Sequence, residues 1–115
     1  MLSFPGGLKV FVALEPVDLR KSFSGLEGLV SERLGEDLRQ GALFVFTNRR
    51  HTRLKILYWD GQGFCLFAKR LEKGRFVWPI TKEGTATLTP AQLSMLLEGI
   101  EWRAPQRTWT PQIAG

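Results

Sequence analysis

The spacing of apolar residues predicts a chain built mainly of short strands. Six segments rich in aliphatic, aromatic and β-branched residues have the length typical of strands, and turn-forming residues separate them. These segments are Leu8–Leu14, Ala42–Thr47, Arg53–Trp59, Phe64–Arg70, Arg75–Ile80 and Thr85–Leu88. Pro79 cannot donate a backbone hydrogen bond, so the segment 75–80 is expected at a sheet edge or near the end of a strand.

Two apolar stripes with helical spacing accompany the strands. The first lies between Asp18, the expected N-cap, and Gly35, near which the helix should end. Its members, at spacings of 4, 3, 4 and 4, are Leu19, Phe23, Leu26, Val30 and Leu34. The second helix should begin at Thr89 and Pro90, since threonine is a good cap and proline suits the first turn. Its apolar members are Leu93, Leu96, Leu97 and Ile100.

These elements predict an α+β fold, in which a curved antiparallel sheet of about five strands carries two helices on one face. Residues 1–102 are expected to form a single domain. Residues 103–115 contain two prolines and predict an irregular tail.

The most specific local prediction is a β-hairpin whose loop is Asp60–Gly63. An Asp-Gly pair between two β-rich segments favours a tight turn. With this loop, Trp59 pairs with Phe64 and Arg53 with Arg70, so the cations share one face with the two aromatic rings. The other face is almost wholly apolar and should meet the helices, although a register slip of one residue would exchange the two faces.

Positive charge is concentrated in the middle of the chain. The net charge of the 115 residues is +5, and residues 49–82 hold nine basic side chains against only Asp60 and Glu72. A concentrated basic region attracts polyanions, whereas the alternative is a solvated face that keeps the protein soluble. The residues expected to hold phosphates are Arg49, Arg50, Arg53, Lys55, Lys69, Arg70, Lys73 and Arg75.

The aromatic pair Trp59 and Phe64 has two interpretations. Such rings can stack on nucleic-acid bases, or they can form a cross-strand pair that only stabilises the hairpin. His51 is expected to be solvated or to contact phosphate.

The sequence offers little that would support catalysis. It has no phosphate-binding GxxxxGK[ST] loop, no GxSxG nucleophile motif and no carboxylate pair whose pKa values would be tuned apart. One histidine and one cysteine cannot form a structural zinc site, and Cys65 should be inert in the apolar face. We therefore expect no catalytic residue, metal or cofactor, and a binding module in preference to an enzyme. The single cysteine and the lack of a long apolar stretch predict a cytoplasmic protein without a membrane span.

Several long blocks resemble one known family. Asp18–Leu26 is similar to its Asp-x-Arg-Lys-x-Phe-Asp-Gly-Leu segment, with Ser24 in place of the more usual aspartate. The other similar blocks are Leu43–Arg50, Trp59–Gly63, Lys69–Pro79, Leu88–Leu93 and Leu96–Trp102. On these residues the chain resembles TnpB, the accessory protein of bacterial insertion sequences of the sixty-six family.

The resemblance implies a role in DNA transposition beside a separate transposase, and it implies no catalytic residues. From charge and face patterning we expect a non-catalytic accessory protein that binds DNA, at the element ends, through the basic hairpin. The alternative is an adaptor that docks on the transposase of the same element without touching DNA, using Trp102, Arg103 and Trp109. A nuclease would need clustered acidic residues that bind a divalent metal, which the sequence supports poorly.

Overall fold

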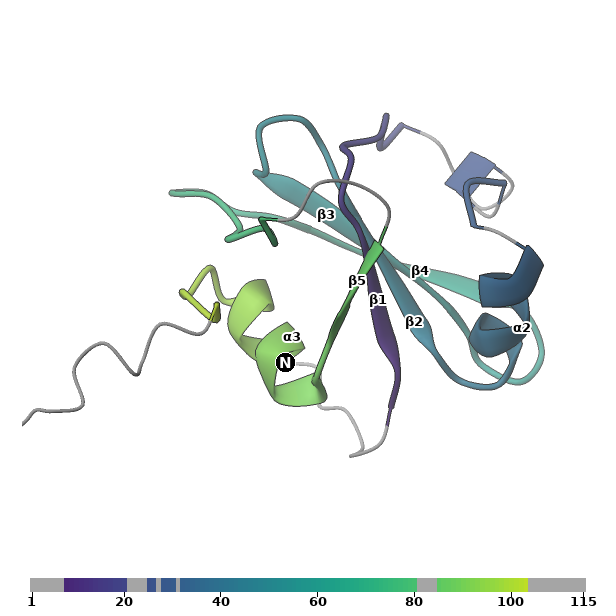
Figure 1. Cartoon of the computed structure of the whole chain (residues 1–115). Coiled ribbons are helices and arrows are strands. Elements are labelled where there is room, and N and C mark those ends of the chain that lie inside the picture. Colours follow the sequence, from purple (N-terminus) through teal and green to yellow (C-terminus); the bar gives the residue numbers. More distant parts are fainter. Residues whose placement is uncertain (1–7, 21–24, 27, 31, 81–84, 104–115) are drawn as a thin grey trace, which may run out of the picture.

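The computed structural model describes residues 8–20, 25–26, 28–30, 32–80 and 85–103. A five-stranded sheet has the spatial order β4-β3-β2-β1-β5, and helices α2 (Glu32–Arg39) and α3 (Pro90–Leu97) pack beside it (Figure 1). The strands are β1 (Val10–Ala13), β2 (Leu43–Thr47), β3 (Arg53–Trp59), β4 (Phe64–Arg70) and β5 (Thr85–Leu88). The α+β class and the five strands are thus confirmed, with β3, β4 and β5 at their predicted bounds.

The sheet is mixed, which corrects the prediction of an antiparallel one. Strand β1 runs parallel to β2, with Val10 beside Leu43, while the other neighbouring strands are antiparallel. Parallel neighbours need a long crossover connection. Residues 14–42 supply it and include α2.

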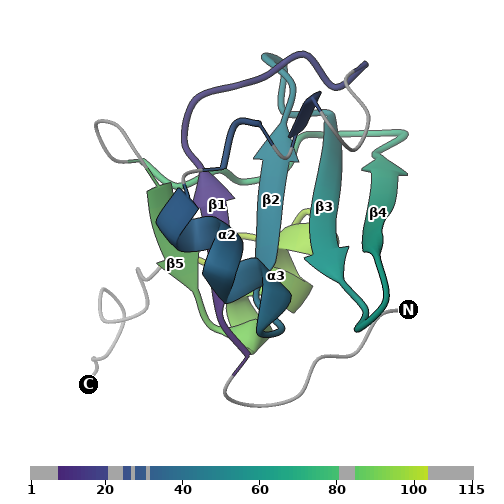
Figure 2. The ribbon, with the colours of Figure 1, turned by 90° about the vertical axis from the view of Figure 1, so that its right-hand side faces the viewer.

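The two helices lie on opposite faces of the sheet, so the prediction that both cover one face is wrong. Leu93 and Leu96 of α3 pack with Ile56 on one face, whereas Leu38 of α2 packs with Leu57 on the other. Figure 2 shows α2 in front of the sheet and α3 behind it. All five residues of β2 are buried, as expected for a strand that is covered on both sides.

The predicted end of the first helix near Gly35 is wrong. Much of the predicted span lies outside the described residues, although Gly25 and Leu26 within it are helical. Helix α2 continues through Gly35 to Arg39, and Gly41, with a φ of 109°, follows its end. A left-handed residue just beyond a helix favours glycine, so Gly41 is the glycine that ends this helix. Phe23 lies outside the described residues.

The start of α3 is confirmed in detail. The Gln92 N–H donates to Thr89 Oγ1 at 3.0 Å, and the Thr89 N–H donates to Gln92 Oε1 at 2.9 Å, which completes a capping box. Ile100, by contrast, lies beyond the helix and is 46% exposed, so it is not part of the apolar stripe. No helix within the described ranges is long and apolar enough to cross a bilayer.

The predicted strand at 75–80 is not formed. This segment carries the chain from the β4 edge of the sheet to the β5 edge, across the face that α3 covers. The Trp78 indole Nε1–H donates to the carbonyl of Ala13 at 2.9 Å, and the Phe76 N–H donates to that of His51 at 2.7 Å. Phe76 and Trp78 are therefore buried by crossing the sheet, without joining the strand ladder, whereas Ile80 is 78% exposed.

Candidate nucleic-acid interface

The predicted hairpin register is confirmed. Across β3 and β4, Arg53 pairs with Arg70, Lys55 with Ala68, Leu57 with Leu66 and Trp59 with Phe64. The eight residues named in these pairs share one face of the sheet, because side chains alternate along a strand. However, only part of this face is exposed to solvent.

The half of the face nearest the hairpin loop is buried at Leu57 and partly buried at its other residues. Leu57 has no exposed surface and packs with Leu38 of α2, Phe44 and Phe46, and Phe64 and Leu66 are partly buried against the same cluster. The prediction of a solvated face is therefore wrong at this end. The Arg39 side chain of α2 lies over the rings of Trp59 and Phe64, the residues that were expected to meet a ligand here.

The aromatic pair belongs to this covered half. The rings of Trp59 and Phe64 lie edge to face, with centroids 5.0 Å apart and planes at 72°. The guanidinium carbon of Arg39 lies 5.3 Å from both ring centroids, within range of a cation–π contact. Since these rings contact one another and Arg39, the geometry supports the cross-strand pairing interpretation over base stacking. Six residues of strand, about 20 Å, separate them from Arg53.

The hairpin loop itself is held by Asp60. Its Oδ1 accepts the N–H groups of Gln62 and Gly63, each at 2.9 Å, and these bonds lower the pKa of Asp60. Cys65 is half-buried beside it, and burial first, then Asp60, raises the pKa of the thiol. His51 lies at the opposite end of the hairpin from Cys65.

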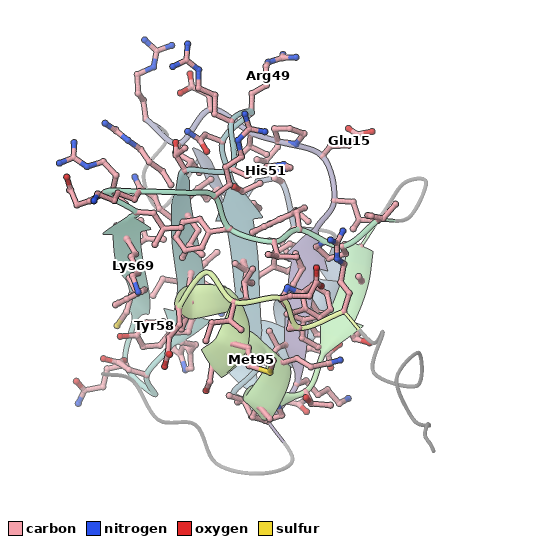
Figure 3. All side chains as sticks on the ribbon, turned by 90° about the vertical axis from the view of Figure 1, so that its left-hand side faces the viewer. Glu15, Arg49, His51, Tyr58, Lys69 and Met95 are labelled. Carbon is pink, nitrogen blue, oxygen red and sulfur yellow. The ribbon has the colours of Figure 1, made fainter. Side chains whose placement is uncertain are left out.

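At that opposite end, basic side chains from several segments come together. The Leu71 N–H donates to the carbonyl of Thr52 at 2.9 Å, and the Phe76 N–H donates to that of His51, which places residues 71–76 beside the β2–β3 turn. Figure 3 shows nitrogen-bearing side chains gathered where Arg49 and His51 are labelled. We call this surface the basic end, and its members are Arg49, Arg50, Arg53, Arg70, Lys73 and Arg75, all of them exposed.

Asn48 orders the turn that presents these cations. Its Oδ1 accepts the backbone N–H groups of Thr52 and Arg53, at 2.9 and 3.1 Å, and its Nδ2 donates to Thr52 Oγ1 at 3.1 Å. A side chain that replaces backbone partners in this way is typical of tight turns. Arg53 is therefore fixed at the first position of β3 by the turn that precedes it.

The His51 side chain is partly buried in this turn, so it is not the solvated side chain that was one expectation; the other, a phosphate contact, stays a prediction. Its ring stacks on Trp78, with centroids 5.6 Å apart and planes at 24°, and its φ is 58°. Burial lowers the pKa of His51, and the charge of Arg75 lowers it further. Within the described part of the chain, no three His, Cys, Asp or Glu side chains are grouped so that they could hold a metal ion.

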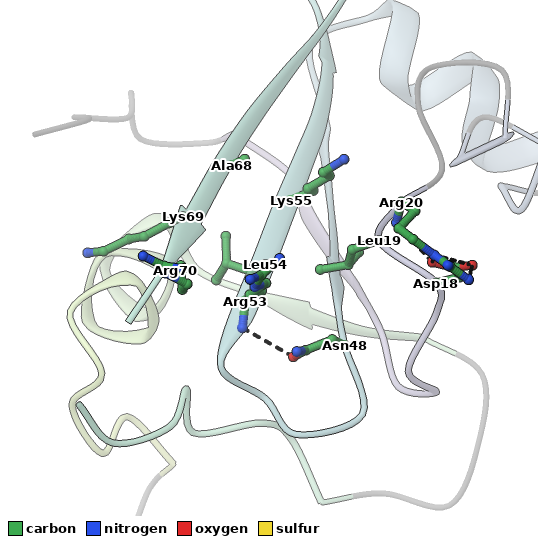
Figure 4. Close-up of a pocket in the computed structure, with 10 residues that line it drawn as sticks. All are labelled: Asp18, Leu19, Arg20, Asn48, Arg53, Leu54, Lys55, Ala68, Lys69 and Arg70. Carbon is green, nitrogen blue, oxygen red and sulfur yellow. Dashed lines mark hydrogen bonds and ion pairs between the residues drawn. The ribbon is translucent and has the colours of Figure 1, made fainter. Parts of the chain in front are cut away.

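The open half of the hairpin face forms one wall of a groove of about 580 Å³. The opposite wall is the segment 17–20, which the Val17 N–H anchors by donating to the carbonyl of Thr47 at 2.9 Å. Figure 4 shows Asp18, Leu19 and Arg20 across the groove from β3 and β4. The residues that line it are Asp18, Leu19, Arg20, Asn48, Arg53, Leu54, Lys55, Ala68, Lys69 and Arg70.

Arg20 is the groove residue that sequence reasoning missed. Asp18, predicted as a helix cap, accepts the Arg20 backbone N–H at 2.9 Å and also binds its guanidinium, with Nη2 2.9 Å from Oδ2. The bonds to Asp18 raise the pKa of Arg20. The sequence did contain a signal for this pair. An aspartate two residues before an arginine can accept both the backbone N–H and the guanidinium of that arginine.

Lys69 does not belong with the other phosphate candidates. Its Nζ donates to the carbonyl of Leu97 at the C-terminal end of α3, where helix carbonyls favour a cation. Arg70 is paired with Glu72, Nη2 to Oε2 at 3.2 Å. Among the described residues, no ion pair involves Arg49, Arg50, Arg53, Lys73 or Arg75.

Two of the candidate partner-binding residues are engaged within the protein. Trp102 is 9% exposed, belongs to the core beneath α3 and donates its indole N–H to the carbonyl of Val77. Arg103 binds Glu101 through two bonds of 2.8 and 2.9 Å, and these lower the pKa of Glu101 to about 2. Trp109 lies outside the described residues.

Comparison with known proteins gives the family. A family model described as IS66 Orf2 like protein matches residues 8–107. Two similar proteins of Sinorhizobium fredii carry the names "Uncharacterized protein y4hO" and "Uncharacterized protein y4jC". The first is 46% identical over 115 residues, the full length of both chains, and the second is 41% identical over 101 residues, covering 88% of this chain and 86% of the relative. No solved structure matches.

The chain therefore belongs to the IS66 Orf2-like family, which confirms the resemblance seen in the sequence. It is an accessory protein of an insertion sequence, with a role in transposition, and such accessory proteins are generally non-catalytic.

Proposed function

We propose that this accessory protein binds DNA and does so through the phosphate contacts of its basic end. The observation that carries the proposal is the convergence of six exposed cations from the β2–β3 turn, both hairpin strands and the segment after β4. Exposed arginines can approach a phosphodiester backbone without first breaking a buried interaction, and arginine binds phosphate in a bidentate way. The proposed contact is with the backbone and not with stacked bases, because Trp59 and Phe64 pack at the other end of the hairpin.

A salt titration of duplex binding tests the proposal. Fluorescence anisotropy should show log affinity falling linearly with log salt, with a slope near −0.9 for each phosphate contact. The triple variant Arg49→Gln/Arg50→Gln/Arg75→Gln should flatten this slope by up to about 2.7. Lys9→Gln is the matched control, because Lys9 is exposed but precedes β1 at the far end of the sheet. Absence of binding at low salt, or equal slopes for both variants, would contradict the proposal.

The same experiment separates DNA binding from transposase docking. Element-end and random duplexes should be compared with and without the transposase of the same element. Affinity for DNA without the transposase supports direct contact. Co-purification of the two proteins in the absence of nucleic acid, lost on deletion of residues 103–115, together with no DNA binding by this chain alone, would favour the adaptor alternative.

A further inference from the structure

Two arginines face each other at the mouth of the groove. Arg53 is the first residue of β3 and Arg70 the last of β4, and they are direct cross-strand partners. Directly opposite residues have Cβ atoms about 4.5–5.5 Å apart, and like charges at such positions destabilise a sheet. An anion between the two guanidinium groups would turn this repulsion into two attractive contacts.

The existing partners of the pair are weak. Within the described part of the chain, the Arg53 side chain makes no ion pair. Glu72, the partner of Arg70, has a side chain that is 81% exposed, and that of Arg70 is 60% exposed. Exposed ion pairs contribute little, so a phosphate that binds both arginines can displace the carboxylate. Glu72 already shows where an oxyanion meets Arg70.

The surroundings leave space for such a ligand. Ala68 lies two residues before Arg70 on the same face of β4. Its small side chain leaves the groove open between the hairpin and the segment 17–20. Across the groove, Asp18 holds the Arg20 guanidinium in place. A third arginine therefore lines the wall opposite the arginine pair (Figure 4).

We propose that Arg53 and Arg70 form a seat for a single phosphate group, with Glu72 as its built-in competitor. The proposal rests on the proposed function for the source of the phosphate, which is one phosphodiester of a DNA backbone. Binding of the phosphate group itself can be measured without DNA.

The first arm of the test uses inorganic phosphate at constant ionic strength. Phosphate should raise the midpoint of thermal unfolding of the wild-type protein, because a ligand that binds only the folded state stabilises it. Arg53→Gln and Arg70→Gln should each abolish this shift, and Lys9→Gln should keep it. Glu72→Gln should bind phosphate roughly two- to fivefold more tightly, as expected from losing a weak competing pair. This gain cannot arise from misfolding, so an unchanged or weaker affinity in Glu72→Gln overturns the proposal.

The second arm uses a DNA duplex. Arg53→Gln and Arg70→Gln should each weaken binding by about tenfold or more, the loss of one charge-assisted contact. The double variant should lose less than the product of the two single effects, because both arginines hold the same phosphate. Wild-type DNA binding that neither substitution weakens overturns the seat but leaves the proposed function standing. Phosphate binding without DNA binding overturns the proposed function and supports the seat.

Discussion

The two halves of one hairpin face have opposite environments. Near the loop, Leu57 is fully buried under α2, and the aromatic pair Trp59–Phe64 contacts Arg39. At the other half, the cross-strand pair Arg53–Arg70 lies at an open groove. The alternation of side chains is the same in both halves, so what differs is the element above the sheet. Helix α2 packs onto the first half, while the segment 17–20 stands away from the second.

The comparison shows that one face of a β-hairpin can be part of the core along one half and part of the surface along the other. Over four residue pairs the same face changes from core to ligand-accessible surface. Burial along the loop half fixes the hairpin against α2. At the other half, Arg53 and Arg70 remain exposed. The following substitutions test how sharply the two halves differ.

The largest effect is expected from Leu57→Ala, in the covered half. Removing a fully buried leucine leaves a cavity and should lower the free energy of unfolding by about 2–5 kcal/mol, measured by urea denaturation. Arg53→Gln, on the same strand and face, should change it by less than about 0.5 kcal/mol. Comparable losses in the two variants would show that the halves are not distinct.

A smaller effect is expected from Trp59→Ala. The half-buried indole packs on Phe64 and beneath Arg39, so its removal should cost about 1–3 kcal/mol in the free energy of unfolding. Duplex affinity, measured by anisotropy where the variant is fully folded, should stay within about twofold of the wild type. A large loss of affinity in a folded Trp59→Ala protein would instead support base stacking by this ring.

The smallest effect concerns pH and His51 at the basic end. Because the pKa of His51 is lowered in the folded state, the unfolded chain binds a proton more readily below the ordinary value of 6.5. Stability should therefore be complete above that value and decline as the pH falls through the window just below it. His51→Asn keeps a residue that tolerates positive φ and should flatten the dependence of the unfolding midpoint between pH 5.5 and 7.5. An unchanged slope in this variant would assign the pH dependence to other groups.

The sequence by itself determined the features that local chemistry controls. The Asp60–Gly63 loop set the register of the hairpin, and Thr89, Pro90 and Gln92 set the start of α3. In each case the bonding partners lie within a few residues of one another, so the pattern contains the whole interaction. The clustering of basic residues in the middle third was likewise visible in the sequence.

Only the tertiary structure decided which parts of these elements are covered. The parallel pairing of β1 with β2, the placement of α2 and α3 on opposite faces, and the groove wall at Asp18–Arg20 all join segments far apart in the chain. Helical spacing shows that a helix has an apolar face, but it does not show which side of a sheet receives it. For this reason the face of β3 and β4 could be assigned from the sequence, whereas its division into core and open groove could not.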